Sequence, residues 1–326
     1  MMSAKDRLIA EIDAALALAR AGGMDQARLK QAWAALDRIA ADPQVGLLGQ
    51  PTQLGLPRKL HSARLRLAKL AGDPVQMTGL RATAVPPQDL LADLFPADPA
   101  TRAAHARAAG QPVTRMVHQL WVGGPVPPNC GIWRAWALRH GWDYRLWQET
   151  DLARLGVTSD PLYLAMRAAG DLPGAVDVAR YHVLAHWGGL YLDCDWYPIR
   201  PELSPEDILP PYGLSAIPEA GPRLVGGAGM LLANGTIATP PQHPAILWLL
   251  QVLPEFAARL PGTPAWWQTG PLPFTLAARR GPVNVLDIGL LGGSVPRGTP
   301  LAEVQAKAQE LAAGPGAEFL LEWKSW

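Results

Sequence analysis

The chain is poor in several residue types that define whole classes of protein. It has two cysteines in 326 residues, Cys130 and Cys194, which form neither a CxxC pair nor a zinc-type cluster, so a disulfide-rich scaffold is excluded. Charged residues make up 17%, with 29 Lys and Arg against 28 Asp and Glu. This near-neutral balance argues against a nucleic-acid partner bound through bulk positive charge. The longest uncharged stretch, 224–254, carries four glycines and four prolines and does not predict a membrane helix.

Apolar residues, in contrast, are abundant. They make up 49% of the chain, enough for a sizeable core, so global disorder is excluded. Tryptophan is over-represented, with 13 Trp against 4 Phe and 6 Tyr. Charged residues from Lys5 to Asp13 interrupt any apolar run near the first residue, so we expect no secretory signal and a cytoplasmic location.

Composition divides the chain after residue 110. The pattern in 1–110 predicts an all-helical N-terminal domain, with helices over 5–20, after a cap at Asp25, over 58–71, and around Leu90 and Ala103. In residues 111–326, β-type runs alternate with helical ones. Strands are predicted at 113–121, 143–147 and 190–192, and a helix at 175–187. This alternation predicts an α/β sheet domain, in which ligands bind at the carboxyl ends of the strands.

One segment of the N-terminal domain is strongly basic. Residues 58–69 contain five cations and no acid: Arg58, Lys59, Arg64, Arg66 and Lys69. Such a segment is suited to an anionic membrane surface, which would place the protein peripherally at the inner face of a membrane, or to an anionic acceptor. The alternative interpretation is a solvated helix face.

A pair of carboxylates is the central chemical feature of the sequence. Asp193 and Asp195 directly follow the β-type tripeptide 190–192. Carboxylate oxygens are the ligands that Mg²⁺ and Mn²⁺ prefer, together with phosphates and water. By itself such a pair also occurs in ordinary surface turns. Cys194 lies between the two and is expected to point to the opposite face as a packed thiol.

A second polar pair lies upstream. Asp177 and Arg180 are separated by three positions in the predicted helix, which places both side chains on one face. The carboxylate is suited to sugar hydroxyls and the guanidinium to a phosphate or a sugar oxygen. The alternative is an ordinary intrahelical ion pair.

Four ordered segments resemble one enzyme family. Residues 117–125 resemble its I-H-Q-x-W-x-G-G-x strand and loop, 143–147 its D-Y-x-x-x-W segment, 174–181 its A-x-x-S-D-x-x-R-Y helix, and 188–195 its G-G-x-Y-x-D-x-D signature. Val176 stands where a Ser is common. The family is glycosyltransferase family 32, which includes initiating mannosyltransferases and bacterial capsular polysaccharide enzymes, and which the catalytic domains of clostridial glucosylating toxins resemble more distantly.

The resemblance is dense over 113–200 and thinner from 226 to 326, where it runs through Asn234, 269–271 and 325–326; residues 1–110 lie outside it. It implies a GT-A fold, a Rossmann-like mixed sheet flanked by helices, over 111–326. It also implies a retaining hexosyltransferase, a bound Mn²⁺ or Mg²⁺, and a nucleotide diphosphate sugar, UDP- or GDP-linked, as donor. The acceptor would be a glycan, a lipid-linked saccharide or a protein.

The resemblance also implies roles for individual residues. Trp121 would stack on the nucleobase, and Tyr191 would pack near the ribose or sugar. Asp177 and Arg180 would hold the sugar. Asp193 would hydrogen-bond the ribose or sugar, and Asp195 would bind the metal directly.

The end of the sequence departs from the family pattern. Relatives close the donor site with a His or an acidic residue followed by Ser and Trp, whereas this chain ends in E-W-K-S-W and has no such His. Glu322 and Ser325 carry oxygens that suit Mn²⁺, and Trp326 would cover the diphosphate. The alternative is a frayed tail.

Two other functions fit parts of the pattern. A phosphatase of the haloacid dehalogenase type would use Asp193 as nucleophile, but it needs Thr or Val soon after the second Asp, where this chain has Trp196 and Tyr197. A non-catalytic sugar-nucleotide or glycan binding protein, or a scaffold, derived from such a transferase, is the other alternative. The intact Asp193, Asp195, Asp177 and Arg180 argue against it, and the missing His leaves it open.

Overall fold

The computed structural model describes residues 3–21, 25–52, 55–73, 76–77, 80, 91–95, 98–127, 129–219, 231–261 and 263–324. The helix expected around Leu90 and the donor-site residues Ser325 and Trp326 lie outside them. The chain divides into two compact units, one of 1–93 with 221–229 and one of 94–220 with 230–326. The domain boundary expected after residue 110 stays a prediction.

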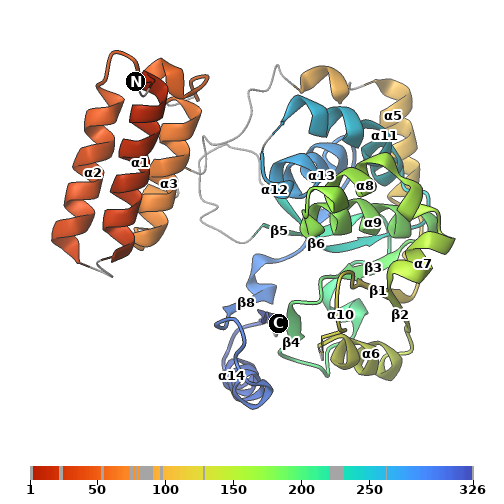
Figure 1. Cartoon of the computed structure of the whole chain (residues 1–326). Coiled ribbons are helices and arrows are strands. Elements are labelled where there is room, and N and C mark those ends of the chain that lie inside the picture. The colour runs from red at the N-terminus through yellow and green to blue at the C-terminus, as the bar shows by residue number, and fades with distance from the viewer. Residues whose placement is uncertain are drawn as a thin grey trace. The chain divides into compact units, whose positions relative to one another are not determined.

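The first unit is built on α1 (Ala4–Ala21), α2 (Gln26–Ala40) and α3 (Arg58–Leu70), which pack side by side (Figure 1). Asp25 accepts a hydrogen bond from the backbone N–H of Ala27, so the predicted cap is confirmed. Aliphatic residues at helical spacing form the shared core: Leu8, Ile12, Leu16, Leu29, Leu36, Leu60 and Leu67. These helices therefore bury one stripe each against the others.

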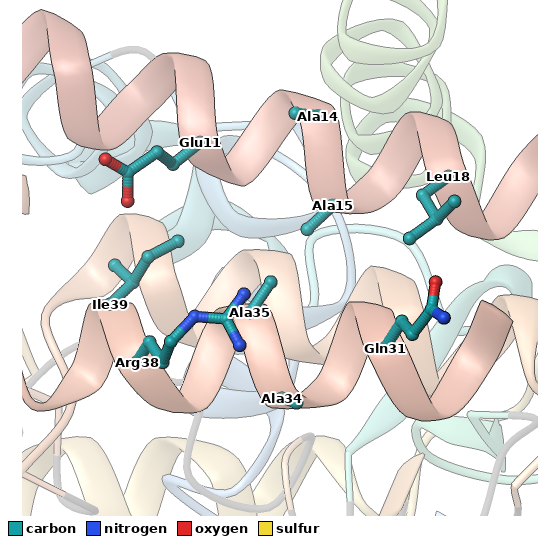
Figure 2. Close-up of a pocket in the computed structure, with 9 residues that line it drawn as sticks. All are labelled: Glu11, Ala14, Ala15, Leu18, Gln31, Ala34, Ala35, Arg38 and Ile39. Carbon is teal, nitrogen blue, oxygen red and sulfur yellow. The ribbon is translucent and has the colours of Figure 1, made fainter. Parts of the chain in front are cut away.

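The surface of this unit has an ion pair in the basic segment 58–69 and a groove between α1 and α2. Nη2 of Arg64 on α3 lies 2.7 Å from Oδ1 of Asp37 on α2, which neutralises one charge of the basic segment 58–69. A groove of about 600 Å³ runs between α1 and α2 and is lined mainly by alanine and aliphatic side chains, with Glu11 and Arg38 also on its walls (Figure 2). Membrane contact through 58–69 stays a prediction. Within the described part of the chain, no helix combines the length and apolar character needed to cross a membrane.

The second unit contains a six-stranded mixed sheet in the order β2-β1-β3-β6-β5-β7. β1 pairs in parallel with β2 and β3, β6 is antiparallel to both β3 and β5, and β5 is parallel to β7. The strands are β1 (Met116–Leu120), β2 (Asp143–Trp147), β3 (Gly189–Leu192), β5 (Ser215–Pro218), β6 (Leu232–Thr239) and β7 (Asn284–Val285). The expected α/β class is therefore confirmed.

Helices cover both faces of this sheet (Figure 1). Successive strand residues point to opposite sides, and apolar residues on each side pack against helices. Tyr191 and Ile237 pack in one core with the helices that include α9, while Leu190 and Ala238 pack in another with α6. The helices of the unit are α5 (Pro99–Ala108), α6 (Asn129–Arg139), α7 (Glu149–Arg154), α8 (Pro161–Ala168), α9 (Leu172–Trp187), α10 (Pro205–Ile208), α11 (Pro244–Arg259), α12 (Ala265–Gln268), α13 (Pro271–Ala278) and α14 (Leu301–Ala313).

Six tryptophans between residues 133 and 196 lie in these cores or pack against them. Trp133, Trp136, Trp142 and Trp147 are buried, and Trp187 and Trp196 are half-buried. Trp133 and Trp136 meet edge to face on α6, with ring centroids 5.1 Å apart. Large rings thus anchor α6 under the sheet.

A smaller sheet of β4 (Trp196–Pro198), β8 (Leu291–Ser294) and β9 (Leu320–Glu322) carries the end of the described chain. β9 runs antiparallel to β4, with Glu322 opposite Trp196. Since β4 follows Asp195 directly, this pairing brings Glu322 close to residues 193–195, the DxD segment.

The turn from α9 into β3 requires its two glycines. Gly188 and Gly189 have φ angles of 63° and 91°, in the region that side chains with a Cβ rarely adopt. A Cβ on Gly188 would also meet the backbone of Pro241, and one on Gly189 the carbonyl oxygen of Met116. The G-G of the G-G-x-Y-x-D-x-D signature is thus needed for the close approach of this turn to Pro241 and to β1.

Candidate functional site

The site is assembled where β3 ends. α9 presents Asp177 and Arg180, and the residue after β3 is Asp193. Nη2 of Arg180 lies 3.2 Å from Oδ1 of Asp177 and 3.1 Å from Oδ1 of Asp193. The guanidinium therefore joins the two polar pairs that the sequence indicated, and the pairing within α9 is only one part of its environment.

Arg180 is buried, and both of its terminal nitrogens have partners. Only 5% of its side chain is exposed, its Nη1 donates to the carbonyl oxygen of Asn234, and it lies over the ring of Tyr191 at 4.6 Å. Burial lowers the pKa of this guanidinium, but the charge of Asp193 and the Tyr191 and Asp177 groups more than offset it, so the pKa is raised. Arg180 is a fixed positive charge that positions its acidic neighbours.

Asp177 is equally enclosed. Its Oδ1 accepts from Nδ2 of Asn234 at 2.7 Å and its Oδ2 from Oγ1 of Thr269 at 2.9 Å. Burial raises the pKa of this carboxyl to about 6, although Arg180, Thr269 and Asn234 act in the opposite direction. At neutral pH the group stays an acceptor with both oxygens engaged.

Asp193 connects this buried cluster to the surface. Oδ1 accepts from the hydroxyl of Tyr191 at 2.7 Å, while 30% of the Asp193 side chain is exposed. Gly235 faces the other oxygen so closely that a Cβ there would collide with it. Asp193 therefore has one oxygen fixed by its own strand and by α9 and the other against the bare backbone of β6.

Asp195 lies in a second, acidic part of the site with the residues around β9. Oε1 of Glu322 lies 2.9 Å from Nζ of Lys324, and Oδ2 of Asp195 lies 3.8 Å from the same nitrogen. Burial raises the pKa of Asp195 to about 7, and the charges of Asp193 and Glu322 add to this, while Lys324 lowers it. This part of the site thus carries more negative charge than its one lysine balances.

The donor atoms present suit a hard divalent cation. Asp195 and Glu322 are the residues that would hold it, because their oxygens already share one cation, Lys324. Among the described residues, no group of three or more His, Cys, Asp or Glu is arranged to hold a metal. Remaining ligands would have to come from water and a bound phosphate; the third predicted ligand, Ser325, lies outside the described residues.

The other predicted donor residues differ in exposure. Tyr191 is buried, and its hydroxyl is used by Asp193. Trp121 follows β1 and is half-buried; its backbone N–H donates to the carbonyl of Trp147, and its indole Nε1 donates to the carbonyl of Gly124 in its own loop. The stacking role of Trp121 and the sugar contact of Tyr191 stay predictions.

His118 has a structural place. Its Nδ1 accepts from Nε1 of Trp147 at 3.1 Å, so its Nε2 carries the proton and donates to the carbonyl of Gly188 at 2.9 Å. Burial lowers its pKa to about 4. A neutral imidazole therefore braces β1 against the glycine turn.

Two site residues carried no local signal in the sequence. Asn234 on β6 and Thr269 before α13 bind Asp177, and Tyr181, the last residue of the motif over 174–181, donates to the carbonyl of Thr269. Asn234 matches a glycosylation sequon and, like 269–271, belongs to the thin part of the resemblance. Lone polar residues on distant elements give no local pattern.

No family model and no curated protein matches the chain. Among solved structures, the PaToxG glycosyltransferase is similar with a TM-score of 0.43 and 16% identity over 59% of this chain and 77% of that chain.

Proposed function

We propose that the protein is a metal-dependent glycosyltransferase. It would move a sugar from a nucleotide diphosphate sugar to a glycan, lipid or protein acceptor, with retention of configuration, on a GT-A type sheet. The retention, the GT-A type and the UDP- or GDP-linked donor are proposed from the resemblance of residues 113–200.

One observation carries the proposal: two carboxylates of a DxD segment lie in different electrostatic settings at one strand end. Asp193 is paired with Arg180 at 3.1 Å and is partly exposed. Asp195 lies in an acidic surrounding with Glu322, where burial and like charge raise its pKa to about 7. Such a division suits one carboxylate that accepts hydrogen bonds from a sugar or ribose and one that holds a cation.

The residues of the site divide into roles. Asp195 and Glu322 would hold Mn²⁺ or Mg²⁺, which when bound offsets the charge that develops on the departing diphosphate. Lys324, whose Nζ pairs with Glu322 and Asp195, would turn to an oxygen of that diphosphate when the cation takes its place. Arg180 is too enclosed to meet a large ligand, so it would act by fixing the carboxylates of Asp177 and Asp193.

A donor screen tests the proposal. The purified chain is titrated by calorimetry with a panel of UDP- and GDP-sugars in the presence of Mn²⁺ and again in EDTA, and released nucleotide and transferred sugar are then followed by mass spectrometry. We expect one donor class to bind more tightly with Mn²⁺ and to turn over. The absence of metal-linked binding to any donor would contradict the proposal.

A second function is favoured by one feature of the same site. Nζ of Lys324 already bridges Glu322 and Asp195, so an internal cation lies where a divalent ion would act. A non-catalytic sugar-nucleotide or glycan binding protein needs no further ion there. Donor binding that is unchanged by EDTA, with no turnover, would favour this alternative.

A further inference from the structure

The two cysteines of the chain meet next to the candidate site. Sγ of Cys130 lies 3.1 Å from Sγ of Cys194, and both residues are buried. They come from segments 64 residues apart: Cys130 from the first turn of α6, and Cys194 from between Asp193 and Asp195. The chain has two cysteines in all, so each is the other's partner thiol.

The pair is connected to the surface on one side. A cavity of about 440 Å³ is lined by Cys130 together with Gly131, Arg134 and Tyr144. A small oxidant such as a peroxide fits this volume easily. Cys194 lies behind Cys130, where its thiol donates to the carbonyl oxygen of Leu120 at 3.3 Å. Cys130 is therefore the thiol that a diffusing oxidant meets first.

We propose that Cys130 and Cys194 form a reversible intramolecular disulfide on exposure to a peroxide. The Cys130 thiolate attacks one peroxide oxygen, so an S–O bond forms and the O–O bond breaks, with water leaving after protonation. The Cys194 thiol then attacks the sulfur of the sulfenic acid: an S–S bond forms, the S–O bond breaks, and the thiol proton leaves with the hydroxyl group as a second water. Two thiols are oxidised, and one peroxide is reduced to two waters.

Closing the bond would move the DxD segment. A disulfide is about 2.05 Å long, so the two sulfurs must approach by about 1 Å. The same two segments are already tied together, because Nδ2 of Asn129 donates to the carbonyl of Trp323 and the N–H of Trp323 donates to the carbonyl of Asp195. A shift of α6 relative to β3 is thus transmitted to both carboxylates, and displacements of this size at a reacting centre cost about 100-fold in rate.

The test counts thiols before and after treatment with hydrogen peroxide. Wild-type protein, denatured in the absence of reductant, should fall from two titratable thiols to none. Its intact mass should drop by two hydrogens, and a proteolytic fragment should join Cys130 to Cys194. Dithiothreitol should restore both thiols. Persistence of both thiols, oxygen addition without a cross-link, or covalent dimers in place of the internal link would overturn the proposal.

Matched variants separate the disulfide from general oxidation. Cys130→Ala and Cys194→Ala each keep one thiol and should form no internal link. The effect on turnover rests on the proposed function. Oxidised wild type should turn over its donor at least about 10-fold more slowly and should recover with dithiothreitol. Cys130→Ala should keep its activity in peroxide. A complete cross-link that leaves turnover unchanged would overturn the coupling to the DxD segment. If reduced protein turns over no donor, the proposed function fails, and the thiol count still decides on the disulfide.

Discussion

Nη2 of Arg180 on α9 lies 3.1 Å from Oδ1 of Asp193, the residue that follows β3. The same nitrogen lies 3.2 Å from Oδ1 of Asp177, so one buried cation fixes two carboxylates from different segments. Removal of one partner of a buried ion pair leaves an uncompensated charge and is much more costly than loss of an exposed pair. Arg180 is therefore the residue on which the geometry of the site depends most.

Replacement of Arg180 tests this dependence. Arg180→Ala should lower the free energy of unfolding by about 3 kcal/mol or more, because Asp177 would stay buried without its counter-charge. Denaturant unfolding followed by tryptophan fluorescence measures the change. Arg154→Ala is the matched control: its side chain is 80% exposed and 3.8 Å from Asp151, so the expected change is below about 0.5 kcal/mol. Equal effects of the two variants would contradict the role of Arg180 in fixing the two carboxylates.

Asp195 gives a prediction about pH. Its pKa is raised to about 7 by burial and by the charges of Asp193 and Glu322, so the folded state holds a proton that the unfolded state releases near the ordinary value of 3.8. The charged carboxyl therefore costs stability as pH rises between these two values, and the full cost is present above pH 7.

Asp195→Asn removes this cost. In EDTA, the variant should gain stability over wild type as pH rises from about 4 to 7, with the largest difference, of order 1 kcal/mol or more, above pH 7. Thermal unfolding across this range measures it. Asp143→Asn, at an exposed carboxyl on β2, is the matched control for the loss of one carboxylate charge. A larger advantage of Asp195→Asn at pH 5 than at pH 8 would contradict the assigned environment.

The glycine turn can be tested with alanine. Gly189→Ala places a Cβ at φ 91° against the carbonyl of Met116 and should destabilise the protein by more than about 2 kcal/mol. Gly131→Ala, in α6 with no atom within 4 Å of the new Cβ, should be neutral or stabilising by up to about 1 kcal/mol. Denaturant midpoints compare the two. A neutral Gly189→Ala would contradict the close approach of β3 to β1.

His118 should stay neutral well below physiological pH. Its pKa is lowered to about 4 by burial, so its contribution to stability is present above the unfolded value near 6.5 and is lost as pH falls toward 4. The imidazole signals of His118, assigned by comparison with His118→Asn, should not shift between pH 8 and 5. A midpoint near 6.5 would show that the ring is not held between Trp147 and Gly188.

Local pattern predicted the elements that carry the motifs. The strand at 143–147 matches β2, and the predicted helix at 175–187 lies within α9, which begins earlier at Leu172 because Asp171 caps it by accepting from the N–H of Gly174. The strand at 113–121 is shorter in the structure, Met116–Leu120. Periodicity and turn residues act over a few positions, which is why they succeed here.

The partners of Asp177 could not be predicted in the same way. Asn234 and Thr269 lie on β6 and after α12, and only the pairing of β6 with β3 and the packing of α12 and α13 bring them to the carboxylate. Nothing in the residues around them indicates this contact. The meeting of Cys130 with Cys194 is of the same kind, since α6 and the DxD segment approach only through the folded sheet.

The most direct test of the proposed function is turnover of the best donor from the screen by wild type and by Asp195→Asn, each in Mn²⁺ and in EDTA. Wild type should release nucleotide diphosphate in Mn²⁺ and lose this activity in EDTA. In either condition the folded variant should be at least about 100-fold slower than wild type in Mn²⁺, because the carboxylate that would hold the cation is gone. Full activity of Asp195→Asn, or of wild type in EDTA, would contradict the account.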